Sequence, residues 1–523
     1  MSGIQKMKLD LARKLDTPAA RRISETIVLI LTAVCLLAVA AQRHSFRILM
    51  AGDSTMADKP LIDNPEHGWG QMLPIFFTDD VTVINFARNG RSTKSFIQEG
   101  RWQDLLNAMH AGDYVFIQFG HNDEKKEDTT RFADPWTAYK QNLIRMIRDV
   151  RAHEGLPILL TPVTRRDFDP QGNFKGTHGD YPAAMKQAAE EEHVPLIDMF
   201  EKSKAVVSAL GPDKSKPLYL NGVVPGEYRS WHGKPDNTHF TRTGAVTMAG
   251  LAVEGIRELH LPLAEDLAPG AVTPLAGTGR VVGLDYYFNN EWRVRKDSVR
   301  ERWHYVWEDT TNSGFSLLGK IVDRLGADLD TLQGAPTDSL LAKMSVYVIV
   351  DPDTPGETAA PQYVSPEDIL VIERWVKNGG VLVMMENDKG NAEFEHFNKL
   401  AERFGIHFNE DSEHRVVGKN YDTGKNDHLP DHPIFTGVKQ IFTKEVCTLR
   451  LDGPAKPVLT ENGMILMAES RVGKGLVFAV GDPWLYNEYM DTRRLPAEYE
   501  NSKAGKNLFS WLLENARPVK LAQ

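Results

Sequence analysis

From residue 47 onward, the chain alternates between two patterns of apolar and polar residues. Short, continuous apolar runs are typical of buried strands, and longer stretches with apolar residues at helical spacing are typical of amphipathic helices. The first half is expected to hold strands at 47–51, 81–85, 114–119, 157–161 and 195–198, and helices at 102–109, 136–153, 182–192 and 241–259. Buried strands that alternate with helices predict right-handed βαβ crossovers and a parallel sheet. Ligands of such a sheet bind at the carboxyl ends of its strands.

The pattern is interrupted at residues 261–279, which read LPLAEDLAPGAVTPLAGTG. This stretch is rich in Pro, Gly and Ala, as linkers are. Beyond it, strands are expected at 346–350, 381–385 and 476–480, and helices at 366–378 and 391–404. A chain of 523 residues exceeds what one hydrophobic core normally needs. The sequence therefore predicts two α/β domains.

The N-terminus carries a basic stretch followed by an almost wholly apolar run at 27–41. The run has the length of a signal-peptide core, and Ala38, Ala40 and Ala41 offer a cleavage site. We expect export to the periplasm or the extracellular space. An uncleaved N-terminal anchor and a buried helix are the alternatives. The two cysteines, Cys35 and Cys447, do not make a disulfide framework.

Composition and net charge limit the kinds of molecule that this protein could bind. Apolar residues make up 41% and charged residues 25% of the chain, as in ordinary globular proteins, and the net charge is -10. A net-acidic surface argues against general nucleic-acid binding, where neutralisation of phosphates dominates affinity. An acidic substrate would need a local basic patch.

Four polar motifs follow predicted strands or precede the last predicted helix: GDST at 52–55, NFARNGRS at 85–92, GHND at 120–123 and DNTH at 236–239. A serine on a tight turn after a strand is exposed for nucleophilic attack, and an Asp three residues before a His can orient its imidazole. Each motif also has a plainer explanation. The serine and the GHND asparagine could cap helices, the second motif could be an ordinary turn, and the fourth a solvated loop.

Together the four motifs resemble the SGNH (GDSL) hydrolases. Five segments are similar to the rhamnogalacturonan acetylesterase branch of that family: GDSTMA at 52–57, GWGQ at 68–71, GRST at 90–93, GRW at 100–102 and DNTHF at 236–240. The resemblance covers about residues 47–259. It implies a flavodoxin-like, three-layer α/β/α domain with a parallel sheet.

The resemblance also implies an activity. The protein would be a serine-dependent carbohydrate acetylesterase that removes O-acetyl groups from rhamnogalacturonan or related glycans. Ser54, His239 and Asp236 would be the catalytic triad. The backbone N–H groups of Ser54 and Gly90 and the side chain of Asn122 would form the oxyanion hole. The implied partner is an acetylated polysaccharide or oligosaccharide, with no cofactor, metal or nucleic acid, and with a membrane only through the N-terminal segment.

Substrate contacts are less defined. Arg91 lies in a basic cluster with Arg88, Lys94 and Arg101, which could meet an acidic polymer or form a solvated face. Trp69 and Trp102 could stack on sugar rings or pack in the core. His121 is expected to be structural, since the resemblance gives it no catalytic step. A lipase or esterase of broad acyl specificity and a non-catalytic carbohydrate-binding protein are the alternative functions.

The second predicted domain resembles glutamine-amidotransferase-like α/β domains. The similar segments are VYVIVD at 346–351, VKNGGVL at 376–382 and Gly481-Asp482. The strand that should lead to the amidotransferase cysteine instead leads to Glu386-Asn387-Asp388, so we expect an accessory or structural role. Glu386, Asp388 and Asp482 could line a sugar or cation site, or serve as caps and loop carboxylates. The predicted organisation is a signal peptide or anchor at 1–42, the hydrolase domain at 45–262, a linker at 263–280 and the accessory domain at 281–519.

Overall fold

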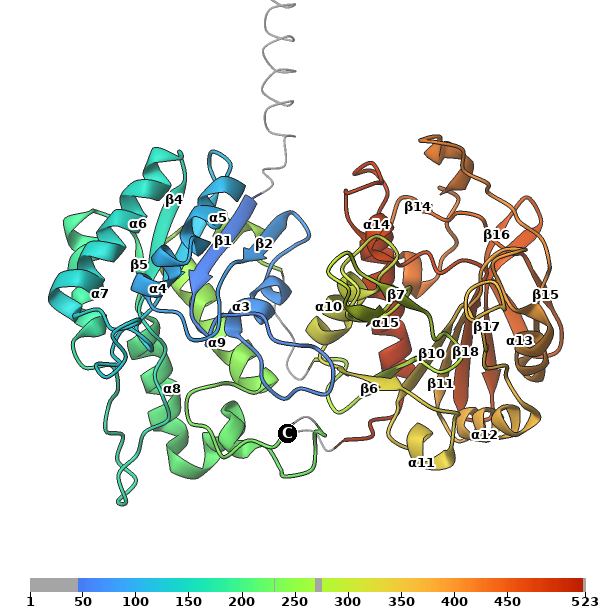
Figure 1. The fold of residues 1–523 in the computed structure, drawn as a ribbon, viewed down its shortest axis with the longest axis horizontal. Helices are drawn as coiled ribbons and strands as arrows, with labels where there is room; N and C mark the ends of the chain where they lie inside the picture. The colour runs from blue at the N-terminus through green and yellow to red at the C-terminus, as the bar shows by residue number, and fades with distance from the viewer. Residues whose placement is uncertain (1–45, 230, 269–274, 521–523) are drawn as a thin grey trace, which may run out of the picture.

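The computed structural model describes residues 46–229, 231–268 and 275–520. Two units, each with its own central sheet, lie side by side, the first blue to green and the second yellow to red (Figure 1). The predicted apolar run at 27–41 and Cys35 lie outside the described residues. Within the described ranges, no helix combines the length and the apolar character needed to span a membrane.

The first unit is built on a five-stranded, wholly parallel sheet with the strand order β2-β1-β3-β4-β5. This is the order of flavodoxin-like doubly wound folds. Its strands are β1 (Phe46–Gly52), β2 (Val81–Asn85), β3 (Tyr114–Gln118), β4 (Leu156–Leu160) and β5 (Leu196–Ile197). The prediction of a parallel α/β sheet is confirmed. The bounds of β2 are as expected, and the other strands differ by one residue at their ends.

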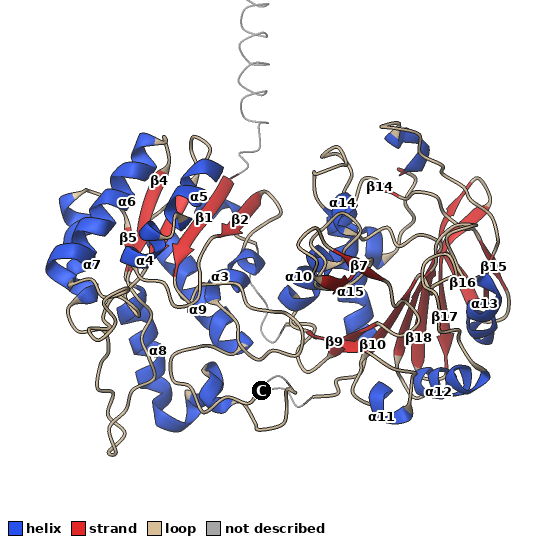
Figure 2. Cartoon of the chain, viewed as in Figure 1, coloured by secondary structure: helices blue, strands red, loops and turns tan. Residues whose placement is uncertain are grey.

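Helices cover both faces of this sheet and make three layers (Figure 2). One face packs against α3 (Trp69–Met72), α8 (Met199–Lys214) and α9 (Arg242–Glu258). The other packs against α4 (Thr93–Gln98), α5 (Arg101–Ala108), α6 (Lys140–Ala152) and α7 (Tyr181–Glu191). Alternate residues of β1 explain the division, because Ile48 and Met50 join the first core and Leu49 and Ala51 join the second.

Some elements were not predicted. Helix α8 was not predicted, and it consists of two helical pieces joined across a kink, where Gly211 takes a φ of 71° and Pro212 follows it. The predicted helix 136–153 begins as a π-helical turn at Pro135–Tyr139 before it becomes α6. Its first residues are held by the Asp134 side chain, which accepts from Trp136 N and Thr137 N.

The second unit has a nine-stranded mixed sheet with the path β12-β15-β17-β18-β11-β10-β6-β9, and β16 pairs with β17. Its parallel part consists of β6 (Val281–Asp285), β9 (Asp328–Leu332), β10 (Val346–Val350), β11 (Val381–Met385) and β18 (Gly475–Val480). The antiparallel part adds β12 (Ile406–Phe408), β15 (Leu449–Leu451), β16 (Ala455–Glu461) and β17 (Met464–Val472). The expected strands 346–350 and 381–385 are observed with those bounds, whereas the antiparallel part was not predicted.

Helices flank this second sheet as well. They are α10 (Ser316–Arg324), α11 (Asp338–Leu341), α12 (Pro366–Lys377), α13 (Phe394–Ala401), α14 (Asn487–Met490) and α15 (Asn501–Asn515). Two short ribbons complete the unit, β7 (Trp292–Val294) with β8 (Arg300–Arg302), and β13 (Lys425–Asn426) with β14 (Ile441–Phe442). The predicted helix 391–404 starts at Phe394, because the Glu393 side chain caps it by accepting from His396 N and Phe397 N.

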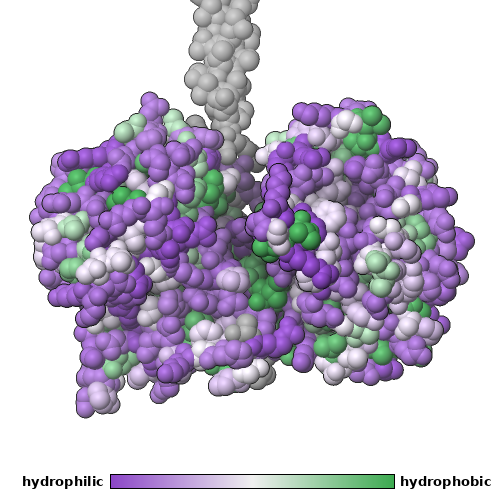
Figure 3. Space-filling view, viewed as in Figure 1, coloured by the Kyte–Doolittle hydropathy of each residue, from purple (hydrophilic) through white to green (hydrophobic). Residues whose placement is uncertain are grey.

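Part of the stretch expected to be a linker packs against the first unit. Residues Pro262–Asp266 form a 3-10 turn, and Leu263 is fully buried in the first core. Residues 269–274 lie outside the described ranges. The face of the molecule in Figure 3 is mainly hydrophilic, and its apolar residues are scattered in small areas, as is usual for a surface in contact with water.

Candidate active site

The turn after β1 presents Ser54. Asp53 shapes this turn, because its Oδ1 accepts from Thr55 N at 2.9 Å and from Thr55 Oγ1 at 2.8 Å. Gln118, at the end of the neighbouring strand β3, donates to Thr55 Oγ1 at 2.8 Å. Burial raises the pKa of Asp53, and the hydrogen bonds from Thr55 oppose that rise. The threonine of the GDST motif therefore ties the serine turn to two strands.

Ser54 and His239 meet although 185 positions separate them. His239 Nε2 lies 2.8 Å from Ser54 Oγ, and His239 Nδ1 lies 2.7 Å from Asp236 Oδ2. The carboxylate can only accept, so it fixes the proton on Nδ1 and leaves Nε2 to accept from the serine hydroxyl. The side chains of His239 and Asp236 are 28% and 30% exposed, so a substrate can reach this row of contacts. The geometry is that of a serine activated by an oriented imidazole.

The Asp236 carboxylate is held in its ionised form. Burial alone would raise its pKa, but the hydrogen bonds from the ring and backbone N–H of His239 and from Thr238 N outweigh burial and lower the pKa to about 2. The loop itself is anchored by the neighbouring turn, since Leu220 N donates to His239 O and Asn221 N donates to Asp236 O. A permanently charged Asp236 stabilises an imidazolium on His239.

Asn122 contacts the loop after β2 that carries Gly90. Gly90 has a φ of 75°, in the left-handed region that glycine tolerates best. Asn122 Nδ2 donates to the carbonyl of Arg91, the next residue, at 3.0 Å. The second N–H of the Asn122 amide takes no partner among the described residues, so it is available as a donor.

The amide of Asn122 is oriented by two cations that sequence reasoning missed. Lys125 Nζ donates to Asn122 Oδ1 at 2.8 Å, and Arg131 Nη1 lies 3.5 Å from the same atom. A lysine only donates, so Oδ1 must face Lys125 and the NH2 group must face the Gly90–Arg91 loop. The signal available in the sequence was the position of Lys125, three residues after Asn122, where it shares one turn with the asparagine.

Of the candidate sugar-binding residues, both tryptophans belong to the core. Trp69 is 0% and Trp102 2% exposed, and their indole N–H groups donate to Gln118 and Asp149. A buried ring offers no face to a sugar, so the stacking hypothesis is wrong for these two residues and the core-packing alternative is right. His121, expected to be structural, is also buried, and its ring lies edge-on to His178 with the centroids 4.3 Å apart.

The basic cluster around Arg91 is largely compensated. Glu99 Oε2 accepts from Arg91 Nε at 2.9 Å and from Arg101 Nε at 2.6 Å. Lys94 Nζ donates to the carbonyl of Thr129 at 2.6 Å. Arg91 remains one-third exposed and close to the Asn122 amide, and its charge is paired with Glu99.

Comparisons with known proteins find relatives of part of this chain. A model of the GDSL-like lipase/acylhydrolase family matches residues 50–245. The rhamnogalacturonan acetylesterase RhgT of Bacillus subtilis is 41% identical over 226 residues, which cover 43% of this chain and 95% of RhgT. The probable rhamnogalacturonan acetylesterase YesY of the same organism is 41% identical over 220 residues, 42% of this chain and 96% of YesY. The solved structure of protein YxiM from Bacillus subtilis shares 30% identity and covers 42% of this chain and 58% of that chain, with a TM-score of 0.37. The matched segment contains Ser54 and His239 in hydrogen-bond contact, and the chain belongs to the GDSL-like lipase/acylhydrolase family.

Proposed function

We propose that this protein is a serine-dependent carbohydrate acetylesterase, which removes O-acetyl groups from rhamnogalacturonan or a related glycan. The observation that carries the proposal is the row Ser54–His239–Asp236, with contacts of 2.8 and 2.7 Å, in a chain whose relatives at 41% identity are named rhamnogalacturonan acetylesterases. Family membership makes hydrolysis of carboxylic esters the reaction.

In the proposed mechanism, Ser54 Oγ attacks the acetyl carbonyl while His239 Nε2 takes the hydroxyl proton. The tetrahedral intermediate collapses to an acetyl-serine as His239 returns the proton to the departing sugar oxygen. Water, deprotonated by His239, then attacks the acetyl-serine and releases acetate. The backbone N–H of Ser54, that of Gly90 and the Asn122 side chain donate to the oxyanion, and loss of one such donor costs about 100- to 1000-fold in rate.

The test is acetate release from a panel of acetylated polysaccharides, with 4-nitrophenyl acetate and a long-chain 4-nitrophenyl ester in parallel. We expect release from acetylated rhamnogalacturonan, preference for the acetyl ester, and a loss of turnover in Ser54→Ala. Preference for the long-chain ester would favour a broad lipase instead, and binding without turnover would favour a carbohydrate-binding protein.

Several assignments accompany this proposal. The catalytic roles of the triad and the oxyanion donors follow from the mechanism, and a substrate contact by Arg91 is supported by its partial exposure next to the Asn122 amide. We also propose that residues 45–262 are the hydrolase domain, 263–280 the linker and 281–519 an amidotransferase-like accessory domain without the catalytic cysteine. Export by the segment 1–42, with cleavage or retention as an anchor, is supported by the apolar run at 27–41.

A further inference from the structure

Among the described residues, the hydrogen bonds to the side chain of Asp323, a buried carboxylate of the second unit, come from residues of the first unit. Asp323 lies in α10, and its side chain is 1% exposed. Its Oδ1 accepts from His67 Nε2 at 2.8 Å and from Arg242 Nη2 at 2.9 Å, and its Oδ2 accepts from Gln71 Nε2 at 2.9 Å. Burial would raise the pKa of Asp323, but His67 and Arg242 outweigh burial and hold it well below its usual range. A buried charge of this kind is tolerable only when its partners are in place.

The contacts of Asp323 with His67 and Gln71 connect it to the turn that carries Ser54. His67 and Gln71 flank the segment 68–70, which packs directly on the turn that carries Ser54. Trp69 N donates to Thr55 O at 2.9 Å. A methyl group at Gly68 would lie 2.1 Å from the carbonyl oxygen of Ala57, so the two segments have no space between them. A shift of His67 and Gln71 would therefore be transmitted to the residue beside Ser54.

Gln71 also connects Asp323 to the loop after β2, which carries Gly90. Gln71 uses its other atom, Oε1, to accept from Lys59 N at 3.0 Å. Lys59 Nζ in turn donates to Asn89 Oδ1 at 2.6 Å and pairs with Glu66 at 2.6 Å. Asn89 directly precedes Gly90. The chain of polar contacts from Asp323 thus ends one residue from a proposed oxyanion donor.

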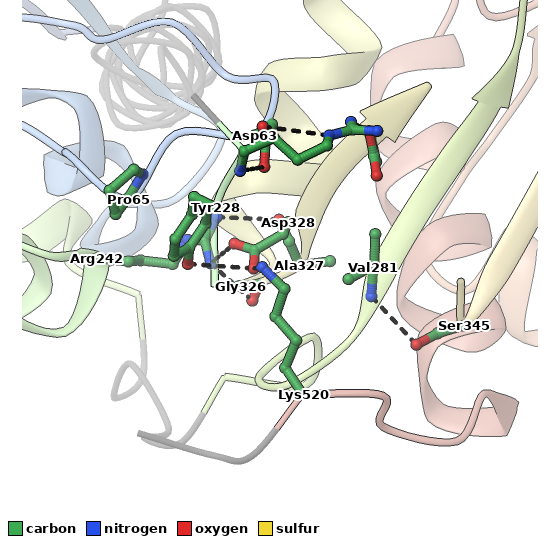
Figure 4. A network of polar contacts seen from close by, with 12 residues as sticks. Asp63, Pro65, Tyr228, Arg242, Val281, Gly326, Ala327, Asp328, Ser345 and Lys520 are labelled. Carbon is green, nitrogen blue, oxygen red and sulfur yellow. Dashed lines mark hydrogen bonds and ion pairs between the residues drawn. The ribbon is translucent and has the colours of Figure 1, made fainter. Parts of the chain in front are cut away.

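The contact of Asp323 with Arg242 connects it to the helix that follows His239. Arg242 is the first residue of α9 and lies three positions after His239. Besides Asp323, it contacts Asp328 Oδ1 at 2.7 Å and the carbonyl oxygens of Gly326 and Ala327. Figure 4 shows Arg242, Tyr228 and Lys520 converging on Asp328, with Lys520 Nζ 2.9 Å from Asp328 Oδ2. The start of the helix behind His239 is thereby fixed to the second unit.

We propose that the second unit is a working part of the active site, and that Asp323 is the positioning residue that fixes the serine turn, the oxyanion loop and the His239 helix against one another. This inference rests on the proposed ester hydrolysis, because it concerns the rate of that reaction. It gives the second unit a role without a ligand of its own. The family model matches residues 50–245, and RhgT and YesY match this chain over 43% and 42% of its length, so these comparisons cover less than half of the chain.

The test uses the full chain, with Asp323→Asn as the variant and Asp338→Asn as the matched control. Asp338 is a carboxylate of the same unit whose pair with Arg374 is well exposed on both sides. The fraction of molecules with a reactive Ser54 is counted with a serine-directed phosphonate, and turnover of 4-nitrophenyl acetate is expressed per reactive site. We expect kcat of Asp323→Asn to fall about 10- to 100-fold while KM stays within about threefold, since displacement of about 1 Å costs that much in rate.

A milder variant keeps the test decisive if Asp323→Asn does not fold. Gln71→Met cuts the link to Lys59 and leaves His67 and Arg242 in contact with Asp323. It should lower kcat per reactive site, with KM retained. If kcat per reactive site in whichever of these variants folds equals that of Asp338→Asn, the second unit does not position the site and the inference is wrong. Absence of Ser54-dependent turnover in the wild type would instead overturn the proposed function.

Discussion

Lys125 is the residue that most changes the chemistry expected of the oxyanion hole. Its ammonium group donates to Asn122 Oδ1, and burial, together with the nearby Arg131 and Arg165 cations, lowers the pKa of Lys125. A cation on the amide oxygen withdraws electrons from the amide nitrogen, which makes Asn122 a stronger hydrogen-bond donor. The same contact prevents the amide from turning its oxygen toward the substrate.

We predict that Lys125→Met lowers kcat on 4-nitrophenyl acetate about 10-fold with little change in KM, because the lost contact acts on a donor that is needed in the transition state. Lys125→Arg should recover part of the rate. The decisive measurement is a double-mutant cycle with Asn122→Ala, in which Lys125→Met should have almost no further effect. Additive losses would show that Lys125 acts on the substrate and not through Asn122.

Among the elements, the short helix α4 has the most direct bearing on the site, because it begins two residues after Arg91 and three after Gly90. Ser92 caps it in a reciprocal arrangement, with Ser92 Oγ accepting from Ser95 N at 3.1 Å and Ser95 Oγ accepting from Ser92 N at 2.9 Å. A helix of six residues has little stability of its own, so the cap matters for where the preceding loop lies.

Ser92→Ala should cost about 1 kcal/mol of stability, the usual value for loss of such a cap. It should also lower kcat, since a frayed α4 releases the Arg91 carbonyl that accepts from Asn122. The control is Ser365→Ala, which removes a matching capping box from α12 in the second unit. Both variants should lose similar stability in urea unfolding, whereas only Ser92→Ala should lose activity. If the two variants were equally active, the cap of α4 would have no influence on the active site.

Elements and motifs differ in how far the sequence could predict them. The strand β2 and the order of the four motifs were predictable, because both depend on local apolar runs and on turns that follow them. The kinked α8 and the antiparallel β12, β15 and β17 were not, because their residues are selected by packing against distant segments. The contacts of Asp323 could not be predicted for the same reason. Nothing near it in sequence indicates that its donors, such as Gln71 252 positions away, come from the other unit.

At the scale of the whole molecule, polar contacts join the two units. Asp323 is buried and pairs with Arg242, whose side chain is 17% exposed, and the exposed Arg229 guanidinium pairs with Asp63 of its own unit and with Asp330 of the other. Truncating one partner of a buried ion pair typically costs about 3–5 kcal/mol, because the other charge is left uncompensated. The units should therefore stabilise each other strongly.

Calorimetry should accordingly show one cooperative unfolding transition for the full chain. In Asp323→Asn the transition should shift to lower temperature and separate into two, as the weaker unit unfolds first. The exposed Asp338→Asn control should leave the transition within about 1 °C of the wild type, since exposed pairs contribute little. Two transitions in the wild-type protein would contradict the mutual stabilisation.

The loop that leaves the Ser54 turn also reaches the edge of the second sheet. Ile62 forms a parallel bridge with Leu329 of the edge strand β9, and Asp63 N donates to Leu329 O at 3.0 Å. An uncovered edge strand is a template on which other chains add strands. A proteolytic cut or a truncation that frees the second unit would uncover β9, and the released fragment would tend to aggregate. The bridge between Ile62 and Leu329 should thus also protect the second unit from addition of foreign strands.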